Sequence, residues 1–128
     1  MEEALQLCPG ANGDWNDYSG WLEDDRNIMA VDGKDTGLAT YNYPGVYSVH
    51  WFFKSRGRDA LNQARAMLDW LFQNSDAKAV RGLTKEHIKA ARWLARQIGF
   101  TSYGIIEFAD GPYELFCMTK EEFYNGRH

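Results

Sequence analysis

Residues 46–72, VYSVHWFFKSRGRDALNQARAMLDWLF, decide the fold, because a strand-like apolar run changes to helical spacing across a basic turn. Residues 46–53 form a nearly continuous run of β-branched and aromatic side chains, typical of a strand covered on both faces. Apolar residues then recur at helical spacing: Ala60, Leu61, Ala64, Met67, Leu68, Leu71 and Phe72. The stretch therefore predicts a strand, a turn and a helix in succession.

The turn, Lys54-Ser55-Arg56-Gly57-Arg58, interrupts the apolar pattern with three cations and a glycine. It is expected at the carboxyl end of the strand and the amino end of the helix, where unpaired backbone N–H groups and the helix dipole favour an anion. The cationic side chains add to this preference. The turn predicts a phosphate or pyrophosphate ligand, with a purely structural turn as the alternative.

The composition is that of a soluble globular protein with one domain, residues 1–128, in which 45% of residues are apolar and 25% charged. With no apolar run of about 18 residues and no charged start before an apolar stretch, the sequence predicts neither a membrane span nor secretion. Cys8 and Cys117 form no CxxC motif, which favours reduced thiols and a cytoplasmic location. The histidines and cysteines show no metal-ligand spacing, so no metal is expected.

Charge is divided unevenly along a chain whose net charge is −4. Residues 1–53 carry 9 acidic and 2 basic side chains, whereas residues 54–128 carry 9 acidic and 12 basic ones. The positive half begins at the basic turn, which supports an anionic ligand there. A nucleic-acid-binding protein would usually show a broader basic surface.

The flanking sequence predicts an irregular segment over residues 1–26 and a core over residues 27–120. The segment is expected to hold a short helix near residues 2–7 and aromatic and apolar side chains that cover the body: Trp15, Tyr18, Trp21 and Leu22. Strands are predicted in the core over residues 27–31, 36–43, 46–53, 79–83, 101–108 and 113–120.

A second helix is predicted from an N-cap at Thr84 to a terminating Gly99, with Ile88 on its apolar face. The resulting order is β-β-β-α-β-α-β-β, an α/β fold with a mixed sheet. A right-handed crossover makes the strand at 79–83 parallel to the strand at 46–53.

In this order the motifs resemble those of the GNAT superfamily, the acyl-CoA-dependent N-acetyltransferases. The resemblance rests on the strand that ends in Val49-His50, on the turn Lys54-x-x-Gly57-x-Asp59, and on the segment from Ala91 to Gly99-Phe100. It covers about residues 27–120, and it implies a GNAT-like mixed sheet with a shortened N-terminal region.

The resemblance implies acetyl-CoA as the cofactor. Its pyrophosphate would lie on the backbone N–H groups of the turn, and its pantetheine arm would run along Val49 and Trp51, where two parallel strands part. A main-chain N–H would polarise the acetyl carbonyl, and a base would deprotonate the acceptor amine. The other residues of the implied site are Lys54, Ser55, Arg56, Gly57, Arg58, Asp59, Ile88 and Ala91.

Three positions depart from the family pattern. Ala95 stands where the family commonly has the tyrosine that protonates the leaving thiolate, and Ile88 where it commonly has asparagine, so neither can donate a hydrogen bond. Asp59 places a carboxylate where a small residue lets the phosphate approach. The region before the first hairpin is also short, which implies a large acceptor that brings its own surface or no acceptor at all.

His50 is the candidate general base, because it lies in the central strand and titrates near neutrality; a hydrogen-bonded core histidine is the alternative. Glu114 and Glu107 lie on the closing hairpin, where the family sometimes places catalytic carboxylates, although alternation favours both facing water. Tyr113 or Tyr103 would supply the acid that the implied site otherwise lacks.

A basic stripe, Lys85, Lys89, Arg92 and Arg96, recurs at helical spacing opposite the apolar face of the second helix. It is expected either to meet the 3′-phosphate of CoA or an acidic partner protein, or to form a solvated face.

Two functions remain open, with a nucleic-acid-binding module on the basic helix as a third. The first is an acetyl-CoA-dependent N-acetyltransferase acting on an amine of a protein or small molecule. The second follows from a similarity to GNAT-like proteins of tailed bacteriophages in the Trp-rich start and residues 49–53 and 115–120. It implies a catalytically silent protein that assembles virions or heads or binds a host factor. Either function allows a protein partner or a homo-oligomer. A cleft filled by bulky side chains would favour the second function, and an empty groove ending at Gly57 the first.

Overall fold

The computed structural model describes residues 23–126. The expected irregular segment, its short helix, its aromatic cover and Cys8 therefore lie outside the described residues, apart from residues 23–26. No helix in the described part of the chain is both long and apolar enough to span a membrane.

The described chain follows the predicted order of elements and adds one helix at the end. The elements are β1 (Ile28–Asp32), β2 (Asp35–Tyr43), β3 (Val46–Phe52), α3 (Gly57–Asn74), β4 (Ala79–Lys85), α4 (Lys89–Ile98), β5 (Thr101–Phe108), β6 (Gly111–Thr119) and α5 (Lys120–Asn125). The added helix begins because Thr119 and Glu122 form a capping box: Thr119 Oγ1 accepts the Glu122 N–H at 3.0 Å, and Glu122 Oε1 accepts the Thr119 N–H at 2.9 Å. The last strand therefore stops at Thr119 instead of continuing to Lys120.

The start of the second helix was predicted wrongly. Thr84 is a strand residue, because β4 stays paired with β6 through Thr84↔Glu114 and Lys85↔Tyr113. Helix α4 begins only at Lys89, after an Ile88 N-cap without a side-chain cap. Its end is as predicted: Gly99 has φ 119°, and its N–H donates to the carbonyl oxygens at the end of α4.

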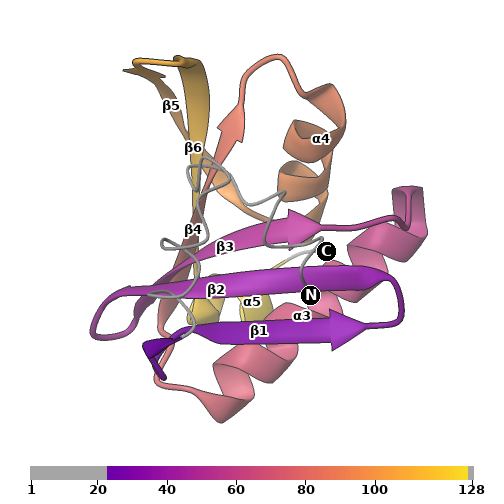
Figure 1. Cartoon of the computed structure of the whole chain (residues 1–128), viewed down its shortest axis with the longest axis vertical. Helices are drawn as coiled ribbons and strands as arrows, with labels where there is room; N and C mark the ends of the chain where they lie inside the picture. Colours follow the sequence, from indigo (N-terminus) through magenta and orange to yellow (C-terminus); the bar gives the residue numbers. More distant parts are fainter. Residues whose placement is uncertain (1–22, 127–128) are drawn as a thin grey trace.

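The strands form one mixed sheet in the order β1-β2-β3-β4-β6-β5. Within residues 23–126, β3 and β4 are the parallel pair, in a register that runs from Val46↔Ala79 to Ser48↔Arg81. Beyond Ser48 and Arg81 the strands are no longer paired, and Figure 1 shows them leaving their shared start in different directions. The predicted parallel crossover is thus confirmed, and it ends in a divergence of the two strands.

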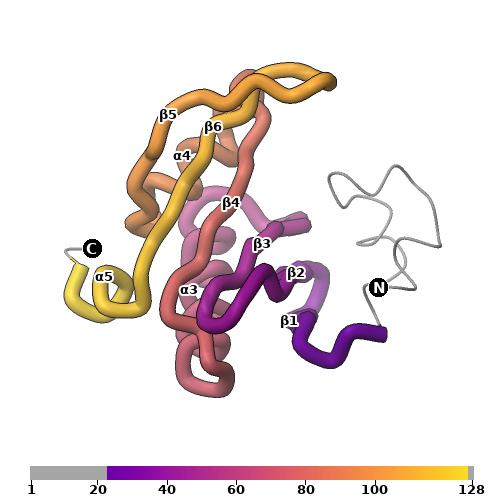
Figure 2. Tube along the Cα trace, turned by 90° about the vertical axis from the view of Figure 1, so that its left-hand side faces the viewer, coloured from indigo at the N-terminus to yellow at the C-terminus, as the bar shows by residue number. Residues whose placement is uncertain are grey.

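The main core lies between α3 and the sheet. The stripe predicted for this helix is buried at Ala60, Leu61, Ala64, Leu68, Leu71 and Phe72, and it packs with buried residues of the strands, among them Tyr47, Val49 and Val80. Figure 2 shows the β5–β6 hairpin extending beyond the body at one end, while α5 lies at the other end of β6. All eight residues of the edge strand β5 are exposed.

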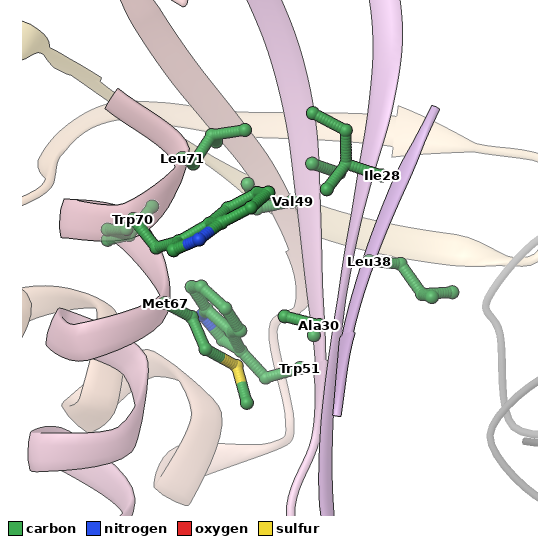
Figure 3. A pocket seen from close by; sticks show the side chains of 11 residues that line it. Ile28, Ala30, Leu38, Val49, Trp51, Met67, Trp70 and Leu71 are labelled. Carbon is green, nitrogen blue, oxygen red and sulfur yellow. The ribbon is translucent and has the colours of Figure 1, made fainter. Parts of the chain in front are cut away.

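Gly37 in β2 lets α3 approach the sheet closely. A Cβ at this position would lie 2.8 Å from Met67 Sδ and 2.9 Å from the Trp51 ring. Figure 3 shows Met67 and Trp51 together in the space between α3 and the strands, whereas Leu38 points away from the helix. The remaining space there is about 20 Å³ and has an almost wholly apolar lining, so Gly37 is needed for tight packing.

Replacement of Gly37 by alanine should destabilise the fold by about 1–3 kcal/mol, because the Trp51 ring or the Met67 side chain must move to admit the methyl group. The matched control is Gly82→Ala in β4, where the nearest atom, the Val49 carbonyl oxygen, would lie at an ordinary 3.5 Å. Urea unfolding measures both variants. Equal free energies of unfolding for the two would contradict this account of Gly37.

Candidate active site

A cleft of about 680 Å³ opens where β3 and β4 part. Val49 and Gly82 are the first residues past the last paired positions, and both line it. Because Gly82 has no side chain, the narrow end of the cleft stays open beside the Val49 carbonyl oxygen. The remaining lining comes mainly from β3, β4 and α4, and includes Trp51, Leu83, Thr84, Ile88, Ala91, Leu94 and Ala95.

The cleft also reaches the basic turn, whose Ser55, Arg56 and Gly57 line it. Gly57, the first residue of α3, has φ +56°, and no atom lies within 4 Å of the position of a Cβ there. The first N–H groups of an α-helix have no partner within the helix, and no side chain caps this end of α3. The turn therefore has backbone donors beside the cleft that lack a partner within the helix, and the phosphate ligand expected there stays a prediction.

A buried carboxylate holds the turn from behind. Asp35, at the start of β2, is fully buried. Its Oδ1 accepts the backbone N–H groups of Lys54 at 2.8 Å and Ser55 at 3.0 Å, and its Oδ2 accepts Gln63 Nε2 at 3.2 Å. Burial by itself raises the pKa of Asp35, but hydrogen bonds from Ser55, Lys54 and Gln63 outweigh it and hold the pKa below the ordinary 3.8. Asp35 is thus an anion at neutral pH.

The Arg56 guanidinium binds the other side of the turn. Its Nη1 donates to the carbonyl oxygens of Phe53 at 2.9 Å and Ser55 at 3.0 Å. Carbonyl oxygens of the turn are therefore engaged by Arg56, whereas the N–H groups of Lys54 and Ser55 are engaged by Asp35. The donors left to the cleft belong to the start of α3.

The structure brings most of the implied CoA-site residues together. Those that line the cleft are Val49, Trp51, Ser55, Arg56, Gly57, Ile88 and Ala91. Lys54, Arg58 and Asp59 are exposed and do not line it. Asp59 lies in the first turn of α3 beside the cleft, and the expected repulsion of a phosphate by its carboxylate stays a prediction. Ala95 lines the cleft, so the hydroxyl that the family commonly places there is missing from inside the site.

His50 lies on the cleft wall. It pairs in register with Leu38, whose side chain points away from α3 (Figure 3), and directly opposed residues share a face of a sheet. Burial lowers the pKa of His50, so its imidazole is neutral at pH 7 and can accept a proton.

Tyr113 also lines the cleft, and its hydroxyl donates to Asp110 Oδ2 at 2.6 Å. This hydrogen bond raises the pKa of Tyr113, which keeps the hydroxyl protonated. Tyr103 is 67% exposed on β5 and does not reach the cleft. Of the two tyrosines considered as acids, Tyr113 is the one at the site.

Glu114 does not line the cleft, and it does not face water either. It is buried and accepts Arg92 Nε at 2.8 Å, Arg96 Nη2 at 2.8 Å and Ser102 Oγ at 2.5 Å. Burial raises its pKa, but the hydroxyl of Ser102 and the two guanidinium groups reverse the direction and hold the pKa below the ordinary 4.5. Glu107 is exposed, as alternation predicted.

The Glu114 cluster adds a structural role to part of the basic stripe. Arg92 and Arg96 pair with Glu114 and so tie α4 to β6, while Arg96, Lys85 and Lys89 remain exposed, as a solvated face would be. Lys85 lines the cleft, and Lys89 is exposed. Among the described residues, no cluster of three or more histidine, cysteine or acidic side chains is arranged to hold a metal ion.

Two residues that shape the site went unnoticed in the sequence. Asp35 has no local signal, because its partners lie 19 to 28 residues away. Gly82 did have a signal, since a glycine inside a strand often marks a close approach or a ligand.

Solved structures that share this fold include two named acetyltransferases. Aminoglycoside acetyltransferase AAC(6′)-Ib in complex with coenzyme A matches with a TM-score of 0.68 and 15% identity, over 96% of this chain and 78% of its own. A variant of spermidine N-acetyltransferase SpeG from Vibrio cholerae matches with a TM-score of 0.70 and 13% identity, over 88% and 79%. RimJ from Mycobacterium smegmatis in complex with CoA-disulfide matches with a TM-score of 0.69 and 15% identity, over 95% and 67%.

No protein-family profile matches the chain, and no curated protein matches its sequence. At such low identities the structural likeness shows the fold alone. The chain thus has the fold of the GNAT acetyltransferases, and the fold class predicted from its motifs is confirmed. The similarity to phage proteins stays a prediction.

Glu114 should stabilise the protein in a pH-dependent way. Because the folded state lowers its pKa, the stabilisation is present above the ordinary 4.5 and is lost as the pH falls toward the folded-state pKa. Glu114→Gln should therefore be less stable than the wild type at pH 7, by about 1–3 kcal/mol because solvent screens the half-exposed arginines. The matched control is the exposed Glu107→Gln.

Urea unfolding at pH 7 and at pH 3.5 tests this prediction. The difference between wild type and Glu114→Gln should shrink at the lower pH, whereas Glu107→Gln should match the wild type at both. A difference that does not depend on pH would contradict the ionised pairing.

Proposed function

We propose that this chain is a GNAT-type N-acetyltransferase, which transfers the acetyl group of acetyl-CoA to an amine. The observation that carries the proposal is the cleft, which runs from the parting of β3 and β4 at Val49 and Gly82 to the amide donors at Gly57. Bulky side chains do not fill it, so a catalytically silent scaffold is not favoured.

The residues present fit acetyl-CoA. The N–H groups at the start of α3 match a pyrophosphate, since helix N-termini favour anions. The unpaired edges of β3 and β4 past Ser48 and Arg81 can take the amide groups of a pantetheine arm as an added strand would. Bound acetyl-CoA supplies the reactive thioester. Lys54, Arg58 and Asp59 would contribute only charge and backbone contacts to acetyl-CoA binding, because their side chains do not line the cleft.

The chain itself has three chemical tasks. A backbone N–H of β3 near Val49 polarises the acetyl carbonyl. His50 takes the proton of the attacking amine, directly or through a water molecule, since its lowered pKa leaves it neutral. Tyr113, the protonated hydroxyl in the cleft, gives a proton to the leaving sulfur in place of the missing group at Ala95. Glu114 is left out of the chemistry, because Arg92 and Arg96 hold it.

The acceptor is an amine that reaches His50 through the cleft that this residue lines. AAC(6′)-Ib and SpeG are named for acting on an aminoglycoside and on spermidine, which supports a small-molecule amine here. A protein amine is the alternative acceptor, and a catalytically silent phage protein is the alternative function.

Calorimetric titration with acetyl-CoA tests the proposal directly. At acetyl-CoA concentrations of 100 times Kd, binding should stabilise the protein by about 2.7 kcal/mol and raise its Tm. Gly82→Leu should abolish both heat and Tm shift, because the side chain enters the narrow end of the cleft, while Gly82→Ala keeps them. The absence of heat and Tm shift with the wild type at millimolar acetyl-CoA would remove the proposed function.

His50→Gln should lower kcat by about 10²–10⁴-fold, as expected for loss of a general base, and leave the Kd for acetyl-CoA unchanged. The exposed His87→Gln is the matched control. Since the pKa of His50 is lowered from 6.5, the wild-type kcat/KM should fall only below that pH. The variant should not show this fall, which is the acidic limb of the pH profile. Steady-state rates against pH decide it, and an unchanged acidic limb would exclude His50 as the base.

A further inference from the structure

The backbone of the turn beside the cleft is held by a residue that does not itself line the cleft. The turn between β3 and α3 has a glycine at φ +56° and an exposed Lys54 and Arg58. Such a segment has several backbone conformations available to it. In the structure one of them is selected by a fully buried acid from another part of the chain, Asp35.

We propose that Asp35 is a positioning residue that orients the turn for pyrophosphate, and thereby makes the enzyme prefer donors that carry a pyrophosphate over those that carry the pantetheine arm alone. The inference rests on the proposed function. Asp35 itself does not line the cleft, so it acts through the backbone of Lys54 and Ser55.

The N–H groups and the carbonyl oxygens of the turn are bound by two different side chains. One oxygen of Asp35 accepts two successive N–H groups, those of Lys54 at 2.8 Å and Ser55 at 3.0 Å. Two successive peptide planes are thereby turned toward the protein interior. Arg56 Nη1 fixes the carbonyl oxygens on the other side, at 2.9 Å and 3.0 Å. With those planes set, the chain enters α3 at Gly57, which lines the cleft at the end of the helix where the first amides have no partner within the helix.

The second oxygen of Asp35 also holds helix α3 in position. It accepts Gln63 Nε2 at 3.2 Å, and the same nitrogen lies 3.4 Å from the Asp32 carbonyl oxygen. Gln63 lies in the second turn of α3. Asp35 therefore links the β1–β2 turn, the basic turn and α3, and all three must keep their relative positions for the amides to converge on one anion.

A carboxylate is required for this task. Every partner of Asp35 donates a hydrogen, so both oxygens must accept, and burial makes an unmatched polar group expensive. An asparagine can present one accepting oxygen, but its NH₂ group would face the Gln63 donor unless the Gln63 amide flips and gives up the Asp32 carbonyl oxygen. Asp35→Asn should thus keep the volume of the side chain and loosen either the turn or its link to Gln63.

The test compares two acetyl donors, acetyl-CoA and S-acetylpantetheine, which lacks the pyrophosphate. In Asp35→Asn, the KM for acetyl-CoA should rise about 10-fold with little change in kcat, while kcat/KM for S-acetylpantetheine stays as in the wild type. The control is Asp32→Asn, because Asp32 is the exposed register partner of Asp35. A merely structural role would lower kcat/KM for both donors equally, and that result would overturn the inference.

Binding of inorganic pyrophosphate gives a readout that does not depend on activity. In the wild type it should shift the amide NMR signals of Gly57, Arg58 and Asp59, and in Asp35→Asn these shifts should require about 10-fold more ligand. If Asp35→Asn fails to fold, Gln63→Leu removes one partner of Asp35 and should raise the KM for acetyl-CoA by about 3-fold, again without changing the use of S-acetylpantetheine.

The outcomes separate the two proposals. A wild type that binds neither acetyl-CoA nor pyrophosphate removes the proposed function and this inference together. A wild type that binds both, with the same donor preference in Asp35→Asn and in Gln63→Leu, removes the inference and leaves the proposed function standing.

Discussion

The site depends on the point where the pairing of β3 with β4 ends, at Ser48↔Arg81. Both strands continue past this point, β3 toward α3 and β4 along β6. Their facing edges therefore carry backbone donors and acceptors without a strand between them. Such groups are costly to bury unpaired, so the divergence is stable only if solvent or a ligand occupies the gap. The absence of a side chain at Gly82 keeps that gap accessible.

Two buried carboxylates hold the walls of the gap in different ways. Glu114 joins α4 to β6 through two guanidinium groups, so its charge is balanced by opposite charge. Asp35 is bound by N–H and hydroxyl donors, so its charge is spread over dipoles. Either arrangement satisfies a buried anion. They differ in the part of the protein that they hold in place. The ion pairs of Glu114 hold a helix, whereas the hydrogen bonds of Asp35 to successive amides hold the peptide planes of a turn.

The sequence predicted what depends on local pattern. A nearly continuous apolar run placed β3, helical spacing placed α3, and the glycine at position 99 ended α4 as expected. The basic turn was recognised because three cations and a glycine lie next to one another. GNAT-like motifs then predicted the mixed sheet and its cleft, and the cleft is found where the strands part.

What the sequence could not predict depends on distant partners. Thr84 has the character of a helix cap, but pairing with Glu114 keeps it in a strand. Glu114 was expected at the surface because alternation does not show that two arginines of α4 face it. Asp35 drew no prediction, since neither its burial nor its link to Ser55 leaves a mark in the neighbouring sequence.

The exposed edge of the sheet has a practical consequence. Strand β5 ends the sheet with unsatisfied peptide groups, and Tyr103, Ile105, Ile106 and Phe108 stand exposed along it. Natural proteins usually blunt such edges with lysine or proline, and β5 contains neither. Solubility at high concentration will therefore be limited by β5 more than by any other strand, and a lysine in place of Ile105 is the simplest way to make the protein tractable for crystallisation.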